Sequence, residues 1–313
     1  MKYTNKHNIP KAMVEAISKN TYDLNKLDPH IISVTSLINP PKIQLLKLRH
    51  NDEIEEDLGN NIFRLFGSAE HEVVGRINPD DRIIEKRFYI DTTSWEIFDK
   101  EQFKEHYKKF PDRIYIAGKP DLYDEKEKSV EDWKITSVYA IKDGAKDEWE
   151  EQINSYCWFI RKLKLKVKKL RINTILRDWR TSESKRIKDY PPIPYKSVII
   201  PIWSSKDQQK FIEKRLAFYL HSQKLPDNKI KICSPEERWR TEEVYATYKG
   251  RNKRALKLFG TKKEAKKFMK NYFLKHCEKL KLEKREAVDK RCLDYCSVNI
   301  FCNYYKKNYE EEN

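Results

Sequence analysis

Apolar and polar residues recur along the chain with two periods, one typical of helices and one typical of strands. Helical spacing of the apolar residues predicts helices over residues 42–50, 61–74, 148–163 and 206–223. Runs rich in β-branched and aromatic residues predict strands over residues 82–90, 113–118, 129–135, 167–179 and 198–203. An apolar run over residues 31–38 predicts a short extended segment, and polar residues 124–128 have the length of a hairpin turn.

The pattern changes after residue 225. Segments 243–248 and 254–259 predict two strands, and Gly250-Arg251-Asn252 between them indicates a hairpin. Thr261 and Glu264 form a capping box, which predicts that a lysine-rich helix begins there and ends near residue 276. These elements together predict a small strand–strand–helix unit.

The two patterns predict an α/β (α+β) fold in two domains. We expect residues 1–225 to form a mixed central sheet flanked by helices, with a helical N-terminal segment, and residues 226–313 to form a C-terminal lobe. No apolar run approaches the ~18–20 residues that span a bilayer, and the N-terminus leads into no hydrophobic signal region. We therefore expect a cytoplasmic protein with no membrane partner.

The charge of the chain favours one class of binding partner. The chain carries 65 Lys and Arg residues against 49 Asp and Glu residues, a net charge of +16. Such a surplus favours a polyanionic partner, because Lys and Arg side chains that neutralise phosphates release counterions. The densest basic stretches are residues 161–169 and 262–270, and either one can line a path for DNA backbone without reading bases.

The sharpest chemical signal is Pro120-Asp121 followed, after ten residues, by Asp132-Trp133-Lys134. On a hairpin that turns at residues 124–128, Asp121 and Asp132 come within a few ångströms of each other, and Lys134 shares a strand face with Asp132. Two carboxylates can hold Mg²⁺ or Mn²⁺, which lowers the pKa of a bound water. The lysine can position that water or stabilise the transition state, so the cluster suits phosphodiester hydrolysis.

Two further motifs accompany these acids. His71 ends Gly67-Ser68-Ala69-Glu70-His71 on the predicted helix 61–74, and Gln152-Ile153-Asn154-Ser155-Tyr156 lies on the predicted helix 148–163. With these motifs, in this order, the chain resembles the RecB-like branch of the PD-(D/E)xK nuclease superfamily from roughly residue 33 to residue 302.

The resemblance implies a restriction-endonuclease-like fold and a role for each matching residue. It implies a metal held by His71, Asp121, Asp132 and the main-chain carbonyl of Trp133. It also implies that Lys134 serves the attacking water, and that Gln152 and Tyr156 support the lysine or reach DNA phosphate. Glu85 on the first predicted strand is a further acidic neighbour.

Six cysteines add a second candidate metal site. Cys292, Cys296 and Cys302 are too closely spaced for three independent buried thiols, whereas Cys157 reads as a buried helix thiol. A four-thiolate site needs one more ligand, for which Cys233 and Cys277 are the candidates.

The surroundings of Cys233 resemble the stretch before the C-terminal cysteine triplet in phage-encoded RecB-like nucleases that carry a 4Fe–4S cluster. The resemblance therefore favours Cys233 as the fourth ligand and an iron–sulfur cluster that pins the C-terminal segment. An all-thiolate site also suits zinc.

The resemblance implies a Mg²⁺- or Mn²⁺-dependent DNA nuclease encoded by a phage or prophage. On the resemblance alone, we expect an exonuclease that acts on DNA ends in recombination or processing. The alternative is a catalytically silent DNA-binding clamp of the same fold, which recruits a recombinase or single-strand annealing protein. The sequence does not separate DNA from RNA as the substrate.

Overall fold

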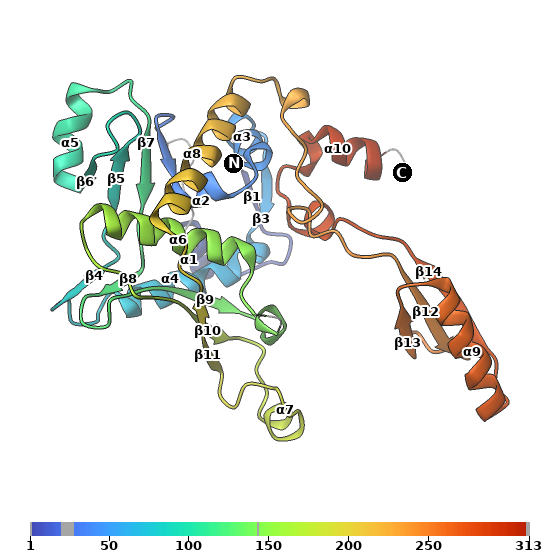
Figure 1. Ribbon diagram of the computed structural model, residues 1–313. Coiled ribbons are helices and arrows are strands. Elements are labelled where there is room, and N and C mark those ends of the chain that lie inside the picture. Colours follow the sequence, from blue (N-terminus) through green and yellow to red (C-terminus); the bar gives the residue numbers. More distant parts are fainter. Residues whose placement is uncertain (1, 20–27, 143, 311–313) are drawn as a thin grey trace. The chain divides into compact units, whose positions relative to one another are not determined.

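The computed structural model describes residues 2–19, 28–142 and 144–310 (Figure 1). The chain divides into two compact units, Met1–Ile230 and Lys231–Asn313. The boundary expected after residue 225 precedes the observed division by one short turn, η4 (Asp227–Lys229). Each unit is described by itself below.

A mixed five-stranded sheet, in the order β11-β10-β9-β8-β4, forms the centre of the first unit (Figure 1). Strands β9 and β10 are parallel, and helix α6 (Asp147–Lys162) connects them, while the other neighbours are antiparallel. The strands are β4 (Arg82–Ile84), β8 (Leu122–Asp124), β9 (Ser129–Thr136), β10 (Lys169–Leu176) and β11 (Tyr195–Ile200).

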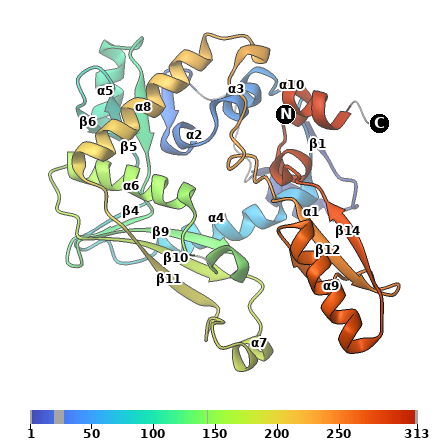
Figure 2. The same cartoon turned by 45° about the vertical axis from the view of Figure 1, so that its right-hand side comes forward.

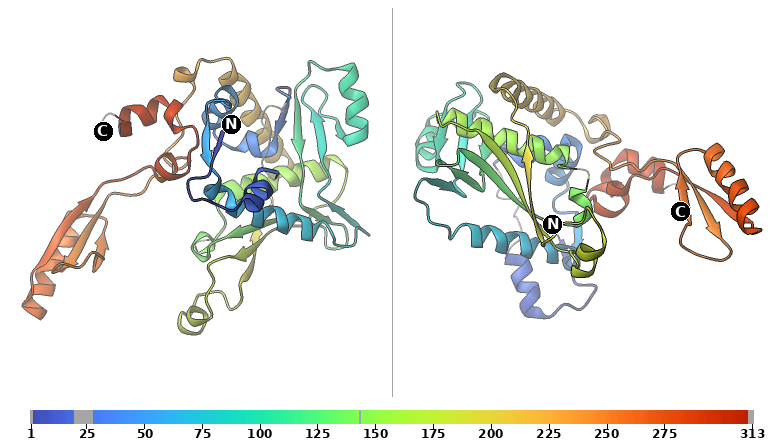
Figure 3. Two further views of the ribbon diagram at one scale, coloured as in Figure 1. Left: turned by 180° about the vertical axis from the view of Figure 1, so that it is seen from behind. Right: turned by 60° about the horizontal axis from the view of Figure 1, so that its bottom comes forward.

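The hydrophobic core lies where α6 packs against β9, β10 and helix α8 (Ser205–Gln223) (Figure 2). Helix α6 is almost wholly buried from Ile153 to Ile160, because apolar residues occupy nearly its entire middle. Helix α4 (Ile62–Val74) runs beside β9 (Figure 3). Two helices that carry predicted site residues therefore contact the strand that carries Asp132.

A second, four-stranded sheet in the order β2-β7-β5-β6 packs against the same core. Its strands are β2 (Ile31–Ser33), β5 (Phe88–Asp91), β6 (Ile97–Asp99) and β7 (Tyr115–Gly118), with helix α5 (Lys100–Lys109) after β6. The remaining elements are β1 (Lys2–Thr4), α1 (Lys11–Lys19), α2 (Val34–Ile38), α3 (Pro41–Arg49), β3 (Glu55–Asp57), η2 (Leu58–Asn61), η3 (Val138–Ile141) and α7 (Thr181–Arg186).

The second unit combines a small sheet with the segments that carry four cysteines. The sheet has the order β13-β12-β14, all antiparallel, and helix α9 packs on it (Figure 2). These elements are β12 (Val244–Lys249), β13 (Lys257–Phe259), α9 (Lys262–His276) and β14 (Leu280–Arg285). The turns η5 (Arg291–Tyr295), η6 (Asn299–Phe301), α10 (Asn303–Tyr305) and η7 (Lys306–Glu310) follow.

The predicted α+β class is confirmed, and so are the helices over α3, α4, α6, α8 and α9 and the hairpin of β12 and β13. Thr261 caps α9 as predicted, because its side chain accepts the backbone N–H of Glu264 at 3.2 Å. The sequence pattern missed β14, β5 as a separate strand, β6 and α5.

Three predictions about strands were wrong. Residues 82–90 are two strands in different sheets, since the backbone turns at Glu85 with a φ of 49°. The strand within residues 113–118 belongs to the second sheet, and the hairpin partner of β9 is the short strand β8. Residues Val34–Ile38 are helical rather than extended, because the Ser33 hydroxyl caps them by accepting the N–H of Ser36.

Candidate active site

The hairpin of β8 and β9 brings the two predicted aspartates together. Asp121 immediately precedes β8, and the antiparallel register sets it opposite Asp132. Both side chains are buried, with 4% and 1% of their residues' surface exposed. Asp121 Oδ2 accepts the backbone N–H of Trp133 at 2.9 Å, and Asp132 Oδ2 lies 2.5 Å from Lys134 Nζ.

Helix α4 and the turn after β4 complete a group of three potential metal ligands. His71 Nδ1 lies 2.8 Å from Glu85 Oε1 and 3.6 Å from Asp121 Oδ1. Ligand atoms of His71, Glu85 and Asp121 all lie within 4.8 Å of one another. Glu85 reaches this group because its own backbone N–H donates to the Asp121 carbonyl at 3.0 Å.

The observed grouping adds one residue to the predicted ligand set. Glu85 joins His71 and Asp121, while Asp132, which lies opposite Asp121 on the hairpin, contacts Lys134. Lys134 is two residues further along the same strand face, so its ammonium neutralises Asp132 locally. Lys119, which the sequence analysis did not single out, forms an ion pair with Glu85.

Glu70 is a buried carboxylate that the sequence analysis quoted within a motif without giving it a role. Burial raises the pKa of Glu70, and its charge interacts with those of Lys134 and Asp132. Glu70 directly precedes His71 on a helix that contacts β9, and this position is the feature of the sequence from which its place in the site could have been predicted.

Buried carboxylate oxygens at this site lack donors. Asp132 Oδ1 and Glu70 Oε1 accept no hydrogen bond from any residue that the structure describes. A buried oxygen of this kind is satisfied by a bound water or a hard cation, and Mg²⁺ prefers oxygen ligands. The residues present therefore fit a divalent cation.

The pKa shifts of the buried groups at this site also favour a bound divalent cation. Burial, and then the negative charge of Asp132, raise the pKa of Asp121 to about 7. Burial alone would lower the pKa of Lys134, but Asp132, Asp121 and Glu70 raise it above its usual value. Carboxylates crowded into a buried space repel one another, and a divalent cation relieves that repulsion.

Gln152 and Tyr156 extend from α6 as predicted, but their contact is with each other. Gln152 Nε2 donates to Tyr156 Oη at 3.2 Å. Tyr156 is buried, and burial followed by the charge of Asp132 raises its pKa. Tyr156 therefore lies toward the carboxylates, and Gln152 positions the tyrosine rather than Lys134.

We predict that the pH dependence of folding stability reports on Asp121. Its pKa rises from 3.8 in the unfolded chain to about 7 in the folded protein, so protonation stabilises the fold. The free energy of unfolding from this group then falls as pH rises between those values, by up to roughly 4 kcal/mol. Thermal unfolding in EDTA should give a lower midpoint at pH 8 than at pH 5.

The variant Asp121→Asn tests this contribution. The hydrogen bond that His71 donates to Glu85 raises the pKa of His71, which therefore also loses stabilising protonation as pH rises above 6.5. The variant removes the titration of Asp121 and also weakens the His71 contribution, because the Asp121 charge helps to raise the pKa of His71. Its midpoint should therefore change less with pH than that of wild type. Equal pH dependence in both proteins would contradict the burial of a titrating Asp121.

The second unit carries the four cysteines that the sequence analysis selected, and no three of them form a close group in the described part of the chain. Burial raises the pKa of Cys233 to about 12, with contributions from Glu237, Cys302 and Cys296. Burial also raises the pKa of Cys292 to about 12, with contributions from Cys296 and Cys302. The alternative ligand Cys277 is exposed at the C-terminal end of α9, away from this group.

The described thiols are not arranged around a single ion. A tetrahedral zinc ion with Zn–S bonds of about 2.3 Å places its sulfurs within about 4 Å of one another. In the described part of the chain, no three cysteine sulfurs lie within 4.8 Å of one another. The choice between zinc and an iron–sulfur cluster therefore stays a proposal.

Buried Asp289 joins the segments that carry these cysteines. Its carboxylate lies 3.1 Å from Arg238 Nε and accepts the hydroxyls of Tyr304 and Tyr309 at 2.8 Å and 2.9 Å. Arg238 in turn donates to the carbonyl of Cys233. These contacts therefore hold the segments that carry the cysteines together without any bound metal.

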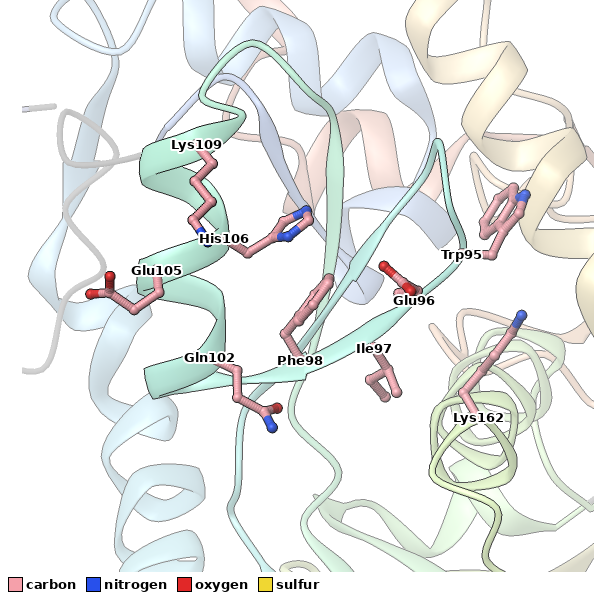
Figure 4. A pocket seen from close by; sticks show the side chains of 9 residues that line it. All are labelled: Trp95, Glu96, Ile97, Phe98, Gln102, Glu105, His106, Lys109 and Lys162. Carbon is pink, nitrogen blue, oxygen red and sulfur yellow. The ribbon is translucent and has the colours of Figure 1, made fainter.

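A pocket of about 600 Å³ lies elsewhere in the first unit (Figure 4). The side chains in Figure 4 come from the turn before β6, from β6, from α5 and from the end of α6, and they include Trp95, Phe98, His106 and Lys162. No predicted site residue lines this pocket. Separately, no described helix has the length and apolar character needed to cross a bilayer.

Comparisons with known proteins leave the activity to be argued from these residues. No protein-family model matches the sequence, and no curated protein is similar to it. Among solved structures, the crystal structure of SSO0001 is similar with a TM-score of 0.40 and 12% sequence identity. The match covers 66% of this chain and 83% of that chain, and similarity at this level carries no argument about fold or activity.

Proposed function

We propose that this protein is a divalent-metal-dependent deoxyribonuclease, an exonuclease that acts on DNA ends in recombination or processing. The observation that carries the proposal is the buried cluster of Asp121, Asp132 and Lys134, bordered by His71 and Glu85. This cluster combines metal ligands with a cation at one point. The choice of DNA ends as the substrate rests on the motifs that resemble those of RecB-like nucleases.

The ligands of the metal would be His71, Glu85, Asp121 and Asp132. A bound divalent cation supplies an activated water and neutralises charge that develops on the phosphate. The Asp132 carboxylate, one of the metal ligands in this proposal, forms an ion pair with Lys134. This pair holds the lysine ammonium 2.5 Å from Asp132 Oδ2. From there Lys134 orients the attacking water and stabilises the anionic phosphate oxygens.

The surrounding residues hold this arrangement in place. The Glu85 carboxylate accepts a hydrogen bond from His71 Nδ1, which fixes the orientation of the imidazole ring. The second ring nitrogen, Nε2, takes no part in this hydrogen bond. Trp133 donates its backbone N–H to Asp121 and so fixes that carboxylate. Tyr156 accepts a hydrogen bond from Gln152 on the same helix, and burial and the charge of Asp132 keep its hydroxyl protonated by raising its pKa.

A 4Fe–4S cluster would be held by Cys233, Cys292, Cys296 and Cys302. In this proposal its role is structural, because it would tie the segment after Ile230 to the C-terminal turns. The contacts of Asp289 already connect the same segments, so the cluster would add a second link between them.

The test is degradation of end-labelled linear DNA beside a closed circle, with Mg²⁺ or Mn²⁺ and with EDTA as the control. We expect loss of linear DNA alone, and no loss in EDTA. Loss of both substrates would keep the metal-dependent nuclease and replace end-dependence with endonuclease action. Binding of DNA without cleavage, in anaerobically purified protein, would overturn the proposal in favour of a catalytically silent clamp.

A further inference from the structure

Most of the net charge of the protein resides in one short part of the second unit. Residues 244–285, called here the basic unit, contain 15 Lys and Arg residues and three Asp and Glu residues. Their net charge of +12 is three quarters of the +16 of the whole chain. The basic unit is the three-stranded sheet with α9 packed on it.

The outer face of α9 concentrates this charge. Four lysines recur at positions i, i+3, i+4 and i+7 and are all exposed, opposite buried Ala265. This lysine stripe consists of Lys263, Lys266, Lys267 and Lys270. It extends over about 10 Å of the helix, at 1.5 Å per residue.

No carboxylate neutralises the stripe. Among the residues that the structure describes, none of the four lysines has a carboxylate oxygen within 4.0 Å, and the three acids of the basic unit are engaged elsewhere. Glu264 accepts the Thr261 hydroxyl, Glu278 pairs with Lys249 at 2.9 Å, and Glu283 lies 3.6 Å from Lys281.

The stripe does not help α9 to fold. Like charges at i, i+3 and i, i+4 destabilise a helix by roughly 0.2–0.5 kcal/mol per pair. Glu264 is the one acid within the described helix, and its carboxylate accepts the Thr261 hydroxyl instead of pairing with the stripe. A row of unpaired, mutually repelling lysines stabilises a complex only when an anionic partner covers it. An anion that is regular, extended and densely charged matches the row best, and nucleic-acid backbone has these properties.

The other basic stretch, residues 161–169, is partly occupied by the fold of the first unit. Arg161 donates to the Trp203 carbonyl and to Gln208, and Lys162 lies over the rings of Trp95 and Trp158. Lys169 pairs with Glu127 at 2.8 Å. These contacts leave fewer free cations there than on α9.

We propose that the basic unit is a sequence-independent docking surface for the backbone of duplex DNA, with the lysine stripe as its phosphate contacts. The identity of the polyanion rests on the proposed nuclease function. The surface binds phosphates and not bases, so it adds affinity without adding sequence preference.

The test compares two triple variants that remove equal charge. The first is Lys263→Ala with Lys267→Ala and Lys270→Ala, and Ala keeps the helix intact because it has the highest helix propensity. The second is Lys164→Ala with Lys166→Ala and Lys168→Ala, three exposed lysines of the first unit. Fluorescence anisotropy measures binding of a labelled duplex in EDTA over a series of KCl concentrations.

Each phosphate contact contributes about 0.9 to the slope of log K against log salt. The stripe variant should therefore lose about 2.7 in slope, and the comparison variant less than about 1. Equal losses in both variants, or an unchanged slope in the stripe variant, would overturn the proposal. The proposal would also be overturned if wild type bound vesicles of anionic lipid through the stripe while the stripe variant bound DNA as wild type does.

The two proposals fail separately. Binding in EDTA requires no cleavage, so a protein that never cuts DNA can still show the slope change. A protein that cuts linear DNA with Mg²⁺ but shows no slope change keeps the nuclease function and loses this docking surface.

Discussion

Asp132→Asn should abolish metal-dependent DNA cleavage while the protein remains folded. The substitution keeps the size of the side chain but removes the negative charge that pairs with Lys134 and that, in this proposal, helps to hold the divalent cation. Loss of about 4 kcal/mol of transition-state stabilisation corresponds to a rate lower by on the order of 10³-fold. Single-turnover cleavage of end-labelled linear DNA measures it.

Glu131→Gln is the matched control for this prediction. Glu131 is the preceding residue on β9 and is also buried, but its carboxylate accepts from Ser129, Arg171 and Asn173. Adjacent strand residues point to opposite faces of the sheet, so Glu131 faces away from Asp132. The control should lower the melting temperature, because charge-assisted hydrogen bonds weaken, and leave the cleavage rate within a few-fold of wild type.

Circular dichroism of both variants separates a local chemical effect from misfolding. If Glu131→Gln reduced cleavage as much as Asp132→Asn at a temperature where both are folded, the site assignment would be wrong. Asp132→Asn with wild-type cleavage would remove the carboxylate cluster from the mechanism altogether.

The second large effect concerns the cysteine site. Anaerobically purified wild type should absorb visible light and contain iron and sulfide, and Cys233→Ser should lose both. Cys233 is half-buried, and in this proposal its replacement removes one of the four thiol ligands of the cluster. Iron and sulfide analysis per chain, with the visible spectrum, measures the loss.

Cys277→Ser is the matched control, because Cys277 is exposed at the end of α9. It should keep the spectrum and the iron content of wild type. The reverse result, with Cys277→Ser colourless and Cys233→Ser unchanged, would transfer the fourth ligand to Cys277. Colourless wild type with one zinc ion per chain would replace the cluster with zinc.

Asp289 makes a more specific expectation possible for the cluster-free protein. Its contacts with Arg238, Tyr304 and Tyr309 do not depend on a cluster, so the cysteine segments should stay folded in Cys233→Ser. The cysteine prediction therefore concerns occupancy of the site and not collapse of the second unit.

Much of the local structure followed from the sequence. The period of apolar residues identified α4, α6 and α8, and Thr261 identified the start of α9. The spacing of Asp121 and Asp132 around a polar turn was enough to place them opposite each other. These features depend on residues a few positions apart, which is why a linear pattern determines them.

Only the tertiary structure decided which side chains share the site. Glu85 joins His71 and Asp121 because the chain turns sharply after β4, and Glu70 reaches Lys134 because α4 packs on β9. The assignment of strands to two sheets was also decided by the tertiary structure, because β7 pairs with β2 and β5 through contacts between residues far apart in the sequence.

The charge of the protein shows the same division. The sequence determined that 65 basic residues exceed 49 acidic ones and that two stretches are lysine-rich. The tertiary structure decided which lysines are free, because it occupies Arg161 and Lys169 with carbonyl and carboxylate partners and leaves the stripe on α9 unpaired among the described residues. Net charge adds along a chain, but pairing requires proximity in space.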